Sequence, residues 1–255
     1  MTWPPKEDVL GTGISTTSID ELVRALAQRH ADRAVVVNVC NVHSVMSART
    51  DAELAGAFAA GDVNTPDGMP LVWFLRRRGH EAQSRVKGSE LALAAVEHGL
   101  ARGWRHYFYG ATDDTLAQLT SALAARHPDI VIAGTEAPPF RPLDEAETDA
   151  ALQRIREARP DIVWVGLGMP KQEKWMHRVS SRLPGTVLVG VGAAFDFLAG
   201  TKPEAPRWLQ DAGLEWAFRL ASEPRRLWRR YAWNNPAFLA LWARDLARSK
   251  RESRS

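Results

Sequence analysis

A carboxylate in a proline-rich turn is the first residue in this chain whose type and setting could do chemistry. Asp67 lies in Pro66-Asp67-Gly68-Met69-Pro70, after a short strand-like stretch and before an apolar helical stretch. Pro-Asp-Gly is a common turn sequence, and as a turn it needs no chemical role. A carboxylate fixed on a rigid loop at the head of a helix could also remove a proton from a hydroxyl group. The sequence therefore makes Asp67 a candidate general base.

A polar pair follows the first strongly apolar run, residues 34–39. Asn41 and His43 occur in Asn41-Val42-His43-Ser44, directly after that run. An amide and an imidazole at this place could bind sugar hydroxyls or a phosphate. Equally, Asn41 could cap a helix and His43 could be a locally satisfied histidine. Both interpretations stay open at this level.

The segment Gly166-Leu167-Gly168-Met169-Pro170 leads from an apolar run into a helical stretch that begins with Lys171 and Gln172. With Pro170 at the first helical position, outward-facing N–H groups and the positive end of the helix dipole would suit a diphosphate. Lys171, Gln172 and the backbone at Gly168 would border the same crevice. The segment lacks the Gly-Lys-Ser/Thr ending of a Walker loop and the third glycine of a dinucleotide fingerprint.

A second small-residue segment, Gly190-Val191-Gly192-Ala193-Ala194-Phe195-Asp196, also follows an apolar run. Small residues let the backbone approach a ligand closely, and Asp196 could accept a hydrogen bond from a ribose or sugar hydroxyl. The alternative is that Asp196 only caps a helix.

The last 49 residues differ from the rest of the chain. They hold five of the ten tryptophans and 11 basic against 5 acidic residues, whereas residues 1–206 hold 22 basic and 25 acidic residues. Basic and aromatic residues interleave over 219–231, which could be a solvated face, a nucleic-acid surface or a membrane-interface surface. The net-acidic body argues against nucleic acid and favours an anionic membrane or a lipid phosphate.

These residues need elements to position them, and the spacing of apolar residues supplies an α/β pattern. Buried strands are expected near residues 34–39, 105–109, 130–133, 162–166 and 186–191, with amphipathic helices between them. Such alternation predicts a Rossmann-like parallel sheet with helices on both faces. Ligands of such sheets bind beyond the carboxyl ends of the strands, where all the candidate segments fall.

The expected domain organisation follows from a change of composition at Ala205-Pro206, after which the chain is rich in Trp and Arg. We expect an α/β core over residues 1–204 and a basic, Trp- and Arg-rich helical appendage over 205–255, its helices broken at Pro224 and Pro236.

Composition excludes several classes. A hydrophobic content of 45% and a charged content of 25% are those of a globular protein, and a single cysteine excludes a disulfide framework. No apolar run approaches the roughly 20 residues that span a bilayer, and the first residues lack a signal-peptide pattern. The seven histidines show no metal-binding spacing and no Asp-x-Asp pair occurs, so we expect no metal and no other cofactor.

The chain resembles the WecG/TagA/CpsF family of bacterial glycosyltransferases from about Gly11 to Trp242. The resemblance is carried by an ordered set of segments: 41–45, 66–70, 170–175, 190–196, 205–208, 213–216 and 219–231. It implies inverting, metal-independent transfer of a sugar from a UDP-sugar to a polyprenyl-diphosphate-linked saccharide, in cell-surface polysaccharide synthesis such as that of teichoic acid. It also implies a cytoplasmic protein peripherally bound to the inner face of the plasma membrane, with no nucleic-acid partner. Whether the protein is a monomer or a homo-oligomer stays open.

The resemblance also implies roles for single residues. Asp67 would be the base, Asn41 and Gln172 would contact the donor sugar, and arginines 219, 226 and 229 (Arg219, Arg226, Arg229) would bind the lipid diphosphate. Teichoic-acid members carry a threonine where this chain has Val39, so the donor (an N-acetylhexosamine, hexose or uronic acid) stays open.

Two rival functions remain. One is a non-catalytic nucleotide- or polyanion-binding protein whose tail docks on nucleic acid. The other is a different nucleotide-sugar enzyme, such as an epimerase or hydrolase, against which the missing dinucleotide fingerprint argues.

Overall fold

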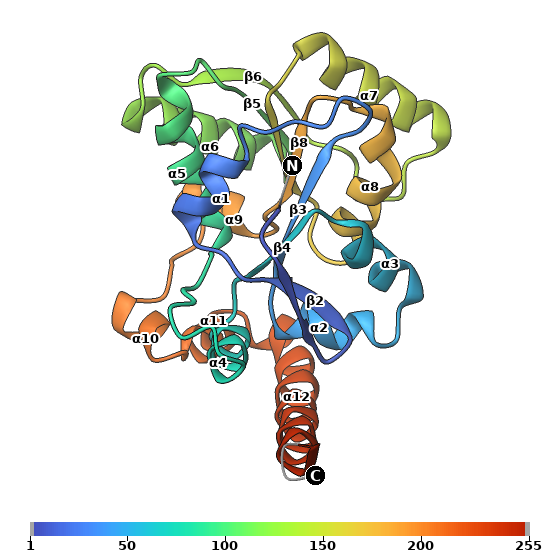
Figure 1. Ribbon diagram of the computed structural model, residues 1–255. Coiled ribbons are helices and arrows are strands. Elements are labelled where there is room, and N and C mark those ends of the chain that lie inside the picture. Colours follow the sequence, from blue (N-terminus) through green and yellow to red (C-terminus); the bar gives the residue numbers. More distant parts are fainter. Residues whose placement is uncertain (1–2, 253–255) are drawn as a thin grey trace.

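The computed structural model describes residues 3–252, and its centre is a six-stranded sheet (Figure 1). The strand order is β4-β3-β8-β7-β5-β6 and every pairing is parallel. The strands are β3 (Val35–Cys40), β4 (Val63–Pro66), β5 (Arg105–Gly110), β6 (Val131–Glu136), β7 (Ile162–Gly166) and β8 (Val187–Gly190). The predicted α/β class with a parallel sheet is confirmed, and each of the five predicted strands is present.

Helices connect the strands and continue beyond the sheet. They are α1 (Ile19–Ala25), α2 (Val42–Ala48), α3 (Ala52–Ala60), α4 (Met69–Arg77), α5 (Gly88–Leu100), α6 (Asp113–Arg126), α7 (Glu145–Ala158), α8 (Lys171–Val179), α9 (Ala194–Leu198), α10 (Arg207–Asp211), α11 (Glu215–Ser222) and α12 (Pro224–Glu252), with a 3₁₀ turn at Ser180–Arg182. An antiparallel hairpin, β1 (Lys6–Val9) and β2 (Thr12–Ser15), precedes them and was not expected from the sequence.

Alternation along the buried strands places apolar side chains on both faces of the sheet. In β3, Val35 and Val37 pack with side chains of α1, α5, α6 and α9, whereas Val36 packs with α7 and α8 on the other face. The same alternation in β7 sends Trp164 to the first face and Val163 to the second. Helices therefore cover both faces, as predicted, and hold the strand ends in fixed positions.

Capping side chains mark several of the helix starts. Ser18 and Glu21 form a reciprocal capping box at the start of α1. Thr112 caps α6. One detail differs from expectation: Pro170 is the N-cap of α8 rather than its first residue, so that Lys171 begins the helix.

The C-terminal segment forms three helices at one end of the molecule, with α12 projecting away from the sheet (Figure 1). The predicted break at Pro236 is wrong, because α12 runs continuously through it. Leu227 and Phe238, on either side of Pro236, are buried, and Phe238 shares a cluster with apolar side chains of α2, α3 and α4. This packing holds the helix together where proline removes one backbone hydrogen bond.

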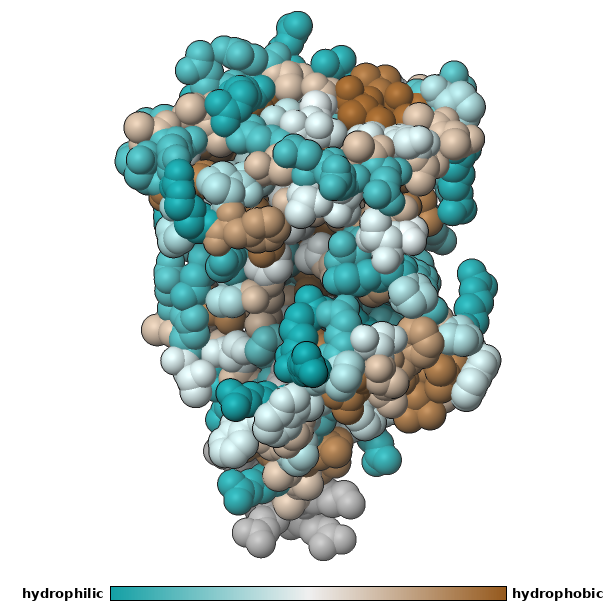
Figure 2. Space-filling view, turned by 180° about the vertical axis from the view of Figure 1, so that it is seen from behind, coloured by the Kyte–Doolittle hydropathy of each residue, from teal (hydrophilic) through white to brown (hydrophobic). Residues whose placement is uncertain are grey.

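The surface of α12 carries both hydrophilic and hydrophobic residues where it tapers from the body (Figure 2). Large exposed apolar side chains on the C-terminal helices include Trp208, Trp228 and Trp233. Within residues 3–252, no helix has the combination of length and apolar composition that crossing a bilayer requires.

Candidate active site

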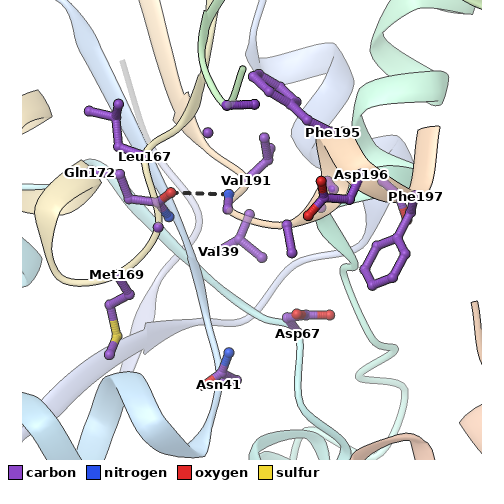
Figure 3. Close-up of a pocket in the computed structure, with 18 of the residues that line it drawn as sticks. Val39, Asn41, Asp67, Leu167, Met169, Gln172, Val191, Phe195, Asp196 and Phe197 are labelled. Carbon is purple, nitrogen blue, oxygen red and sulfur yellow. Dashed lines mark hydrogen bonds between the residues drawn. The ribbon is translucent and has the colours of Figure 1, made fainter. Parts of the chain in front are cut away.

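The carboxyl ends of the strands open into a cleft of about 460 Å³. Residues that follow each of the six strands line it, and the α11–α12 region closes one side. Because the strands are parallel, segments far apart in the sequence meet at this edge. Figure 3 shows Asp67 and Asn41 across the cleft from the 191–197 segment.

Asp67 follows β4 and lies just before α4. Its backbone N–H donates to the Cys40 carbonyl oxygen at 2.7 Å, which ties the turn to the end of β3. The Arg85 guanidinium donates to its carboxylate, with Nη2 at 3.1 Å and Nε at 3.2 Å from Oδ1. The hydrogen bonds that its carboxylate accepts from described residues thus all go to Oδ1. This leaves Oδ2 as the oxygen that can take up a proton.

Arg85, from the segment between α4 and α5, is a site residue that the sequence analysis missed. Its Nη2 also lies 2.7 Å from Oε2 of Glu215 in α11. Burial alone would lower the pKa of Arg85, but the carboxylates of Asp67 and Glu215 raise it above its ordinary value. The cation is therefore permanent. No motif marked it, because an isolated arginine between helices has no characteristic spacing.

Asn41 caps a helix, as one of the two interpretations of the sequence held, and it also lines the cleft. Its Oδ1 accepts hydrogen bonds from the backbone N–H groups of His43 (3.0 Å) and Ser44 (3.4 Å), so it caps α2. The same residue lines the cleft beside Asp67. His43 lies one step further along, where its Nδ1 contacts Oγ of Ser47 (3.1 Å) and Nδ2 of Asn234 in α12 (2.9 Å).

Gln172 is buried in the wall of the cleft, and protein groups hold both ends of its amide. Its Oε1 accepts from the Gly192 N–H at 3.0 Å (Figure 3), and its Nε2 donates to Oε1 of Glu173 at 2.9 Å. The side chain thus fixes the loop after β8 against the start of α8.

Glu173, next to Gln172, was not singled out by the sequence analysis. It is 1% exposed, it lines the cleft, and its Oε2 has no hydrogen-bond partner among the described residues. Burial raises the pKa of this carboxyl to about 7, and the hydrogen bond from Gln172 only partly opposes that rise. A carboxyl that titrates near neutral pH therefore forms part of the wall.

Of the other loop residues predicted for the site, Gly168 and Asp196 line the cleft and Lys171 lies outside it. Gly168 lines the cleft with a φ of +76°, a conformation that suits glycine. Asp196 also lines it, within α9, and forms an ion pair with Lys202 at 2.9 Å. Lys171 is exposed at the start of α8 and is not among the residues that line the cleft.

Basic residues lie on the side of the cleft that faces the C-terminal helices. Arg219 and Arg226 line it, and the Arg219 guanidinium lies 5.5 Å from the centre of the Phe197 ring. Lys87, which the sequence analysis did not select, is buried at the start of α5 and also lines the cleft. Arg229 is exposed over the Trp228 ring, at 5.3 Å, outside the lining residues.

A second, smaller cavity of about 90 Å³ adjoins the first. It is lined by His43, by the start of α4 and by residues of α11 and α12 such as Trp216 and Tyr231. Asn41, Asp67, Glu215 and Arg219 line both cavities. Asp67 therefore lies at the junction of two spaces, one over the sheet and one beneath the appendage.

Comparison with known proteins agrees with this architecture. A protein of Bacillus subtilis (strain 168), N-acetylglucosaminyldiphosphoundecaprenol N-acetyl-beta-D-mannosaminyltransferase, is 28% identical over 218 residues, which cover 84% of this chain and 82% of that protein. The profile of the glycosyl transferase WecG/TagA/CpsF family matches residues 7–252, almost the whole chain and both cavities. The chain is therefore a glycosyltransferase that belongs to the WecG/TagA/CpsF family.

Proposed function

We propose that this enzyme transfers a sugar from a UDP-sugar to a polyprenyl-diphosphate-linked saccharide, with inversion at the anomeric carbon and without a metal ion. The observation that carries the proposal is the position of Asp67 between two cavities. One cavity would hold the donor and the other the acceptor, so that a single carboxylate can act where the two substrates meet.

The larger cavity has features that suit a nucleoside diphosphate. Gly88 and Ser89, in the first turn of the 13-residue helix α5, line it. Helix N-termini attract phosphate groups through free N–H groups and the helix dipole. Lys87 and Arg219 add positive charge. These groups could stabilise the UDP that leaves, which is the task a metal ion performs in other transferases.

An exposed aromatic side chain suits the uracil ring of the donor. Phe140, in the loop between β6 and α7, is 81% exposed and yet lines the cleft. A large apolar side chain left in solvent at a cleft is well placed to stack on the flat face of a uracil ring. Asp196, on another part of the lining, could accept a hydrogen bond from a ribose hydroxyl, while Asn41 and Gln172 would border the sugar.

The chemical step needs one base. Oδ2 of Asp67 would take the proton from an acceptor hydroxyl while the oxygen of that hydroxyl forms a bond to the anomeric carbon. The bond from that carbon to the diphosphate oxygen breaks, and its electron pair leaves with UDP. Attack opposite to the leaving group inverts the configuration. Arg85 would hold the carboxylate in the direction of the hydroxyl.

The smaller cavity and the appendage would serve the acceptor. The Bacillus subtilis relative is named for an acceptor that carries N-acetylglucosamine on diphosphoundecaprenol. Arg219, Arg226 and Arg229 lie on α11 and α12, where planar guanidinium groups could bind the lipid diphosphate. Exposed tryptophans and arginines on the same helices fit contact with the inner face of the plasma membrane.

Replacement of Asp67 tests the base. Asp67→Asn keeps the shape and a hydrogen bond to Arg85 but removes the proton acceptor, so kcat should fall by roughly 10²- to 10⁴-fold with the UDP affinity unchanged. UDP release and the mass of the lipid product report turnover. Asp211→Asn, an exposed carboxylate of α10, is the control and should keep full activity. Near wild-type turnover by Asp67→Asn would show that Asp67 is not the base.

A panel of UDP-sugars, assayed with a short-chain polyprenyl-diphosphate–GlcNAc acceptor and EDTA, names the donor. The expected result is one product whose mass rises by one hexose, N-acetylhexosamine or uronic acid. A requirement for divalent metal would contradict the metal-independent step. Absence of nucleotide binding across the panel, together with binding of single-stranded DNA, would favour the rival polyanion-binding function.

A further inference from the structure

One guanidinium nitrogen joins the core to the appendage at the reaction centre. Nη2 of Arg85 lies 3.1 Å from Oδ1 of Asp67 and 2.7 Å from Oε2 of Glu215. The three side chains are 17%, 21% and 15% exposed, respectively, so water screens them only in part. Asp67 belongs to the core, whereas Glu215 begins helix α11 of the appendage.

The two carboxylates compete for one positive charge. An arginine paired with a single carboxylate stabilises its ionised form and makes it a weaker proton acceptor. A second carboxylate on the same nitrogen draws part of that interaction away. The shorter contact of Nη2 is the one to Glu215, while Nε of Arg85 also donates to the backbone carbonyl and to Oδ1 of Asp67, so the core and the appendage share Arg85. Asp67 then keeps its orientation, while Arg85 attracts the Asp67 carboxylate less strongly.

The other ion pairs near this junction include neither Asp67 nor Arg85. Lys87 binds Glu204 at 3.0 Å, and Lys202 binds Asp196 at 2.9 Å and Glu223 at 3.3 Å. Among the ion pairs that the structure gives between the core and residues beyond 204, only that of Glu215 reaches the partner of Asp67. In the sequence, Glu215 is only one residue of the segment Gly213-Leu214-Glu215-Trp216 that carries the family resemblance, and no role was predicted for it.

We propose that Glu215 is a positioning residue for sugar transfer: from α11 it holds Arg85 and offsets part of the positive charge that Arg85 presents to Asp67, so that Asp67 is a more effective base. This inference rests on the proposed role of Asp67. It makes the appendage a contributor to the position of Arg85 beside Asp67 as well as a wall of the acceptor cavity.

A double-mutant cycle on the full chain tests the proposal. Glu215→Gln, Arg85→Ala and the double variant are compared by kcat and by KM for the UDP-sugar and for the polyprenyl-diphosphate–GlcNAc acceptor. In the wild-type background, Glu215→Gln should lower kcat by about tenfold with both KM values little changed. In the Arg85→Ala background, it should change kcat by less than about twofold, because its effect passes through Arg85.

Two controls separate this effect from loss of structure. Asp211→Asn, the exposed appendage carboxylate, should keep wild-type kcat, and thermal unfolding should show that Glu215→Gln remains folded. Glu215→Asp keeps a negative charge on the same turn of α11, so it should recover part of the lost kcat. A purely steric role would not distinguish Asp from Gln in this way.

The outcomes that overturn the inference are distinct from those that overturn the proposed function. An equal loss of kcat in both backgrounds, or a change confined to the acceptor KM, would show that Glu215 acts directly on substrate. A wild-type kcat for Glu215→Gln, with Asp67→Asn inactive, would reject the inference alone. An active Asp67→Asn would reject the proposed base and the inference together.

Discussion

Two side chains of this site stabilise local structure and also line the cavities. Asn41 caps α2 through Oδ1 and also borders both cavities. Gln172 holds the loop after β8 through Gly192 and stands in the wall of the larger cavity. A substitution at either position would change the local backbone as well as the proposed substrate contact. For that reason, Asp67 and Glu215 are better probes of the chemistry than Asn41 or Gln172.

The buried carboxyl of Glu173 predicts a pH-dependent stability. Its pKa is raised by burial to about 7, against 4.5 for an ordinary glutamate. Below about pH 4.5 both the folded and unfolded chains are protonated there, so the group has no effect on stability. As the pH rises toward 7, the unfolded chain ionises first and the free energy of unfolding falls. The full loss, of order 3 kcal/mol, is present above pH 7.

Glu173→Gln removes this titration and should flatten the curve. Urea unfolding at pH 5 and pH 8 measures the free energy of unfolding, and its fall between these values should be smaller in the variant than in the wild type. Glu81→Gln, at an exposed position, is the matched control and should follow the wild type. Parallel curves for Glu173→Gln and the wild type would mean that this carboxyl is not held neutral.

At the scale of elements, close packing of strand ends shapes the cleft. A Cβ on Gly166, at the end of β7, would lie 2.6 Å from Cδ2 of Phe195 in α9. Phe195 is buried in the hydrophobic cluster on one face of the sheet. The small residue therefore lets α9 approach β7 and sets the width of the cleft.

Gly166→Ala should for this reason displace α9 and cost about 1–3 kcal/mol of stability. Affinity for UDP should fall as well, because α9 carries Asp196. Gly56→Ala is the matched control: Gly56 lies inside α3 with open space around it, and alanine there should stabilise the helix by roughly 0.5–1 kcal/mol. Thermal unfolding and UDP titration of both variants measure the two effects. An unchanged melting temperature for Gly166→Ala would contradict the packing argument.

On the scale of the whole molecule, the net positive charge of the chain lies in the residues of the appendage. Arg225 and Arg244 are exposed on α12, and exposed tryptophans lie on the same group of helices. Each basic residue close to an anionic membrane contributes about 1 kcal/mol of attraction. Phe238 is buried against the body, so removing the appendage would uncover apolar core, and charge reversal is the cleaner probe.

Arg225→Glu with Arg244→Glu should weaken binding to vesicles of anionic lipid by about tenfold or more. Arg102→Glu with Arg178→Glu changes the net charge equally on the body and should weaken binding much less. Vesicle sedimentation compares the two variants. Equal losses would mean that net charge alone governs binding. Loss of affinity for single-stranded DNA, with vesicle binding intact, would favour a nucleic-acid surface on the appendage.

The amino-acid sequence by itself determined the α/β class, five of the six strands of the parallel sheet, Asp67 as a candidate base and the contrast between body and appendage. These depend on local periodicity, turn composition and charge, which neighbouring residues carry. It did not reveal the β1–β2 hairpin or the continuity of α12 through Pro236. Short strands give little periodicity, and proline within a helix is tolerated only where tertiary packing holds both sides.

Only the tertiary structure brought together Arg85, Lys87, Glu173 and Glu215. Each is an ordinary charged residue in the sequence, and Glu215 lies 130 positions from Arg85. What makes them part of a site is burial and the approach of distant segments at the carboxyl ends of parallel strands. Electrostatic interactions strengthen as water is excluded, so the chemistry of these groups depends on an environment that only the folded chain creates.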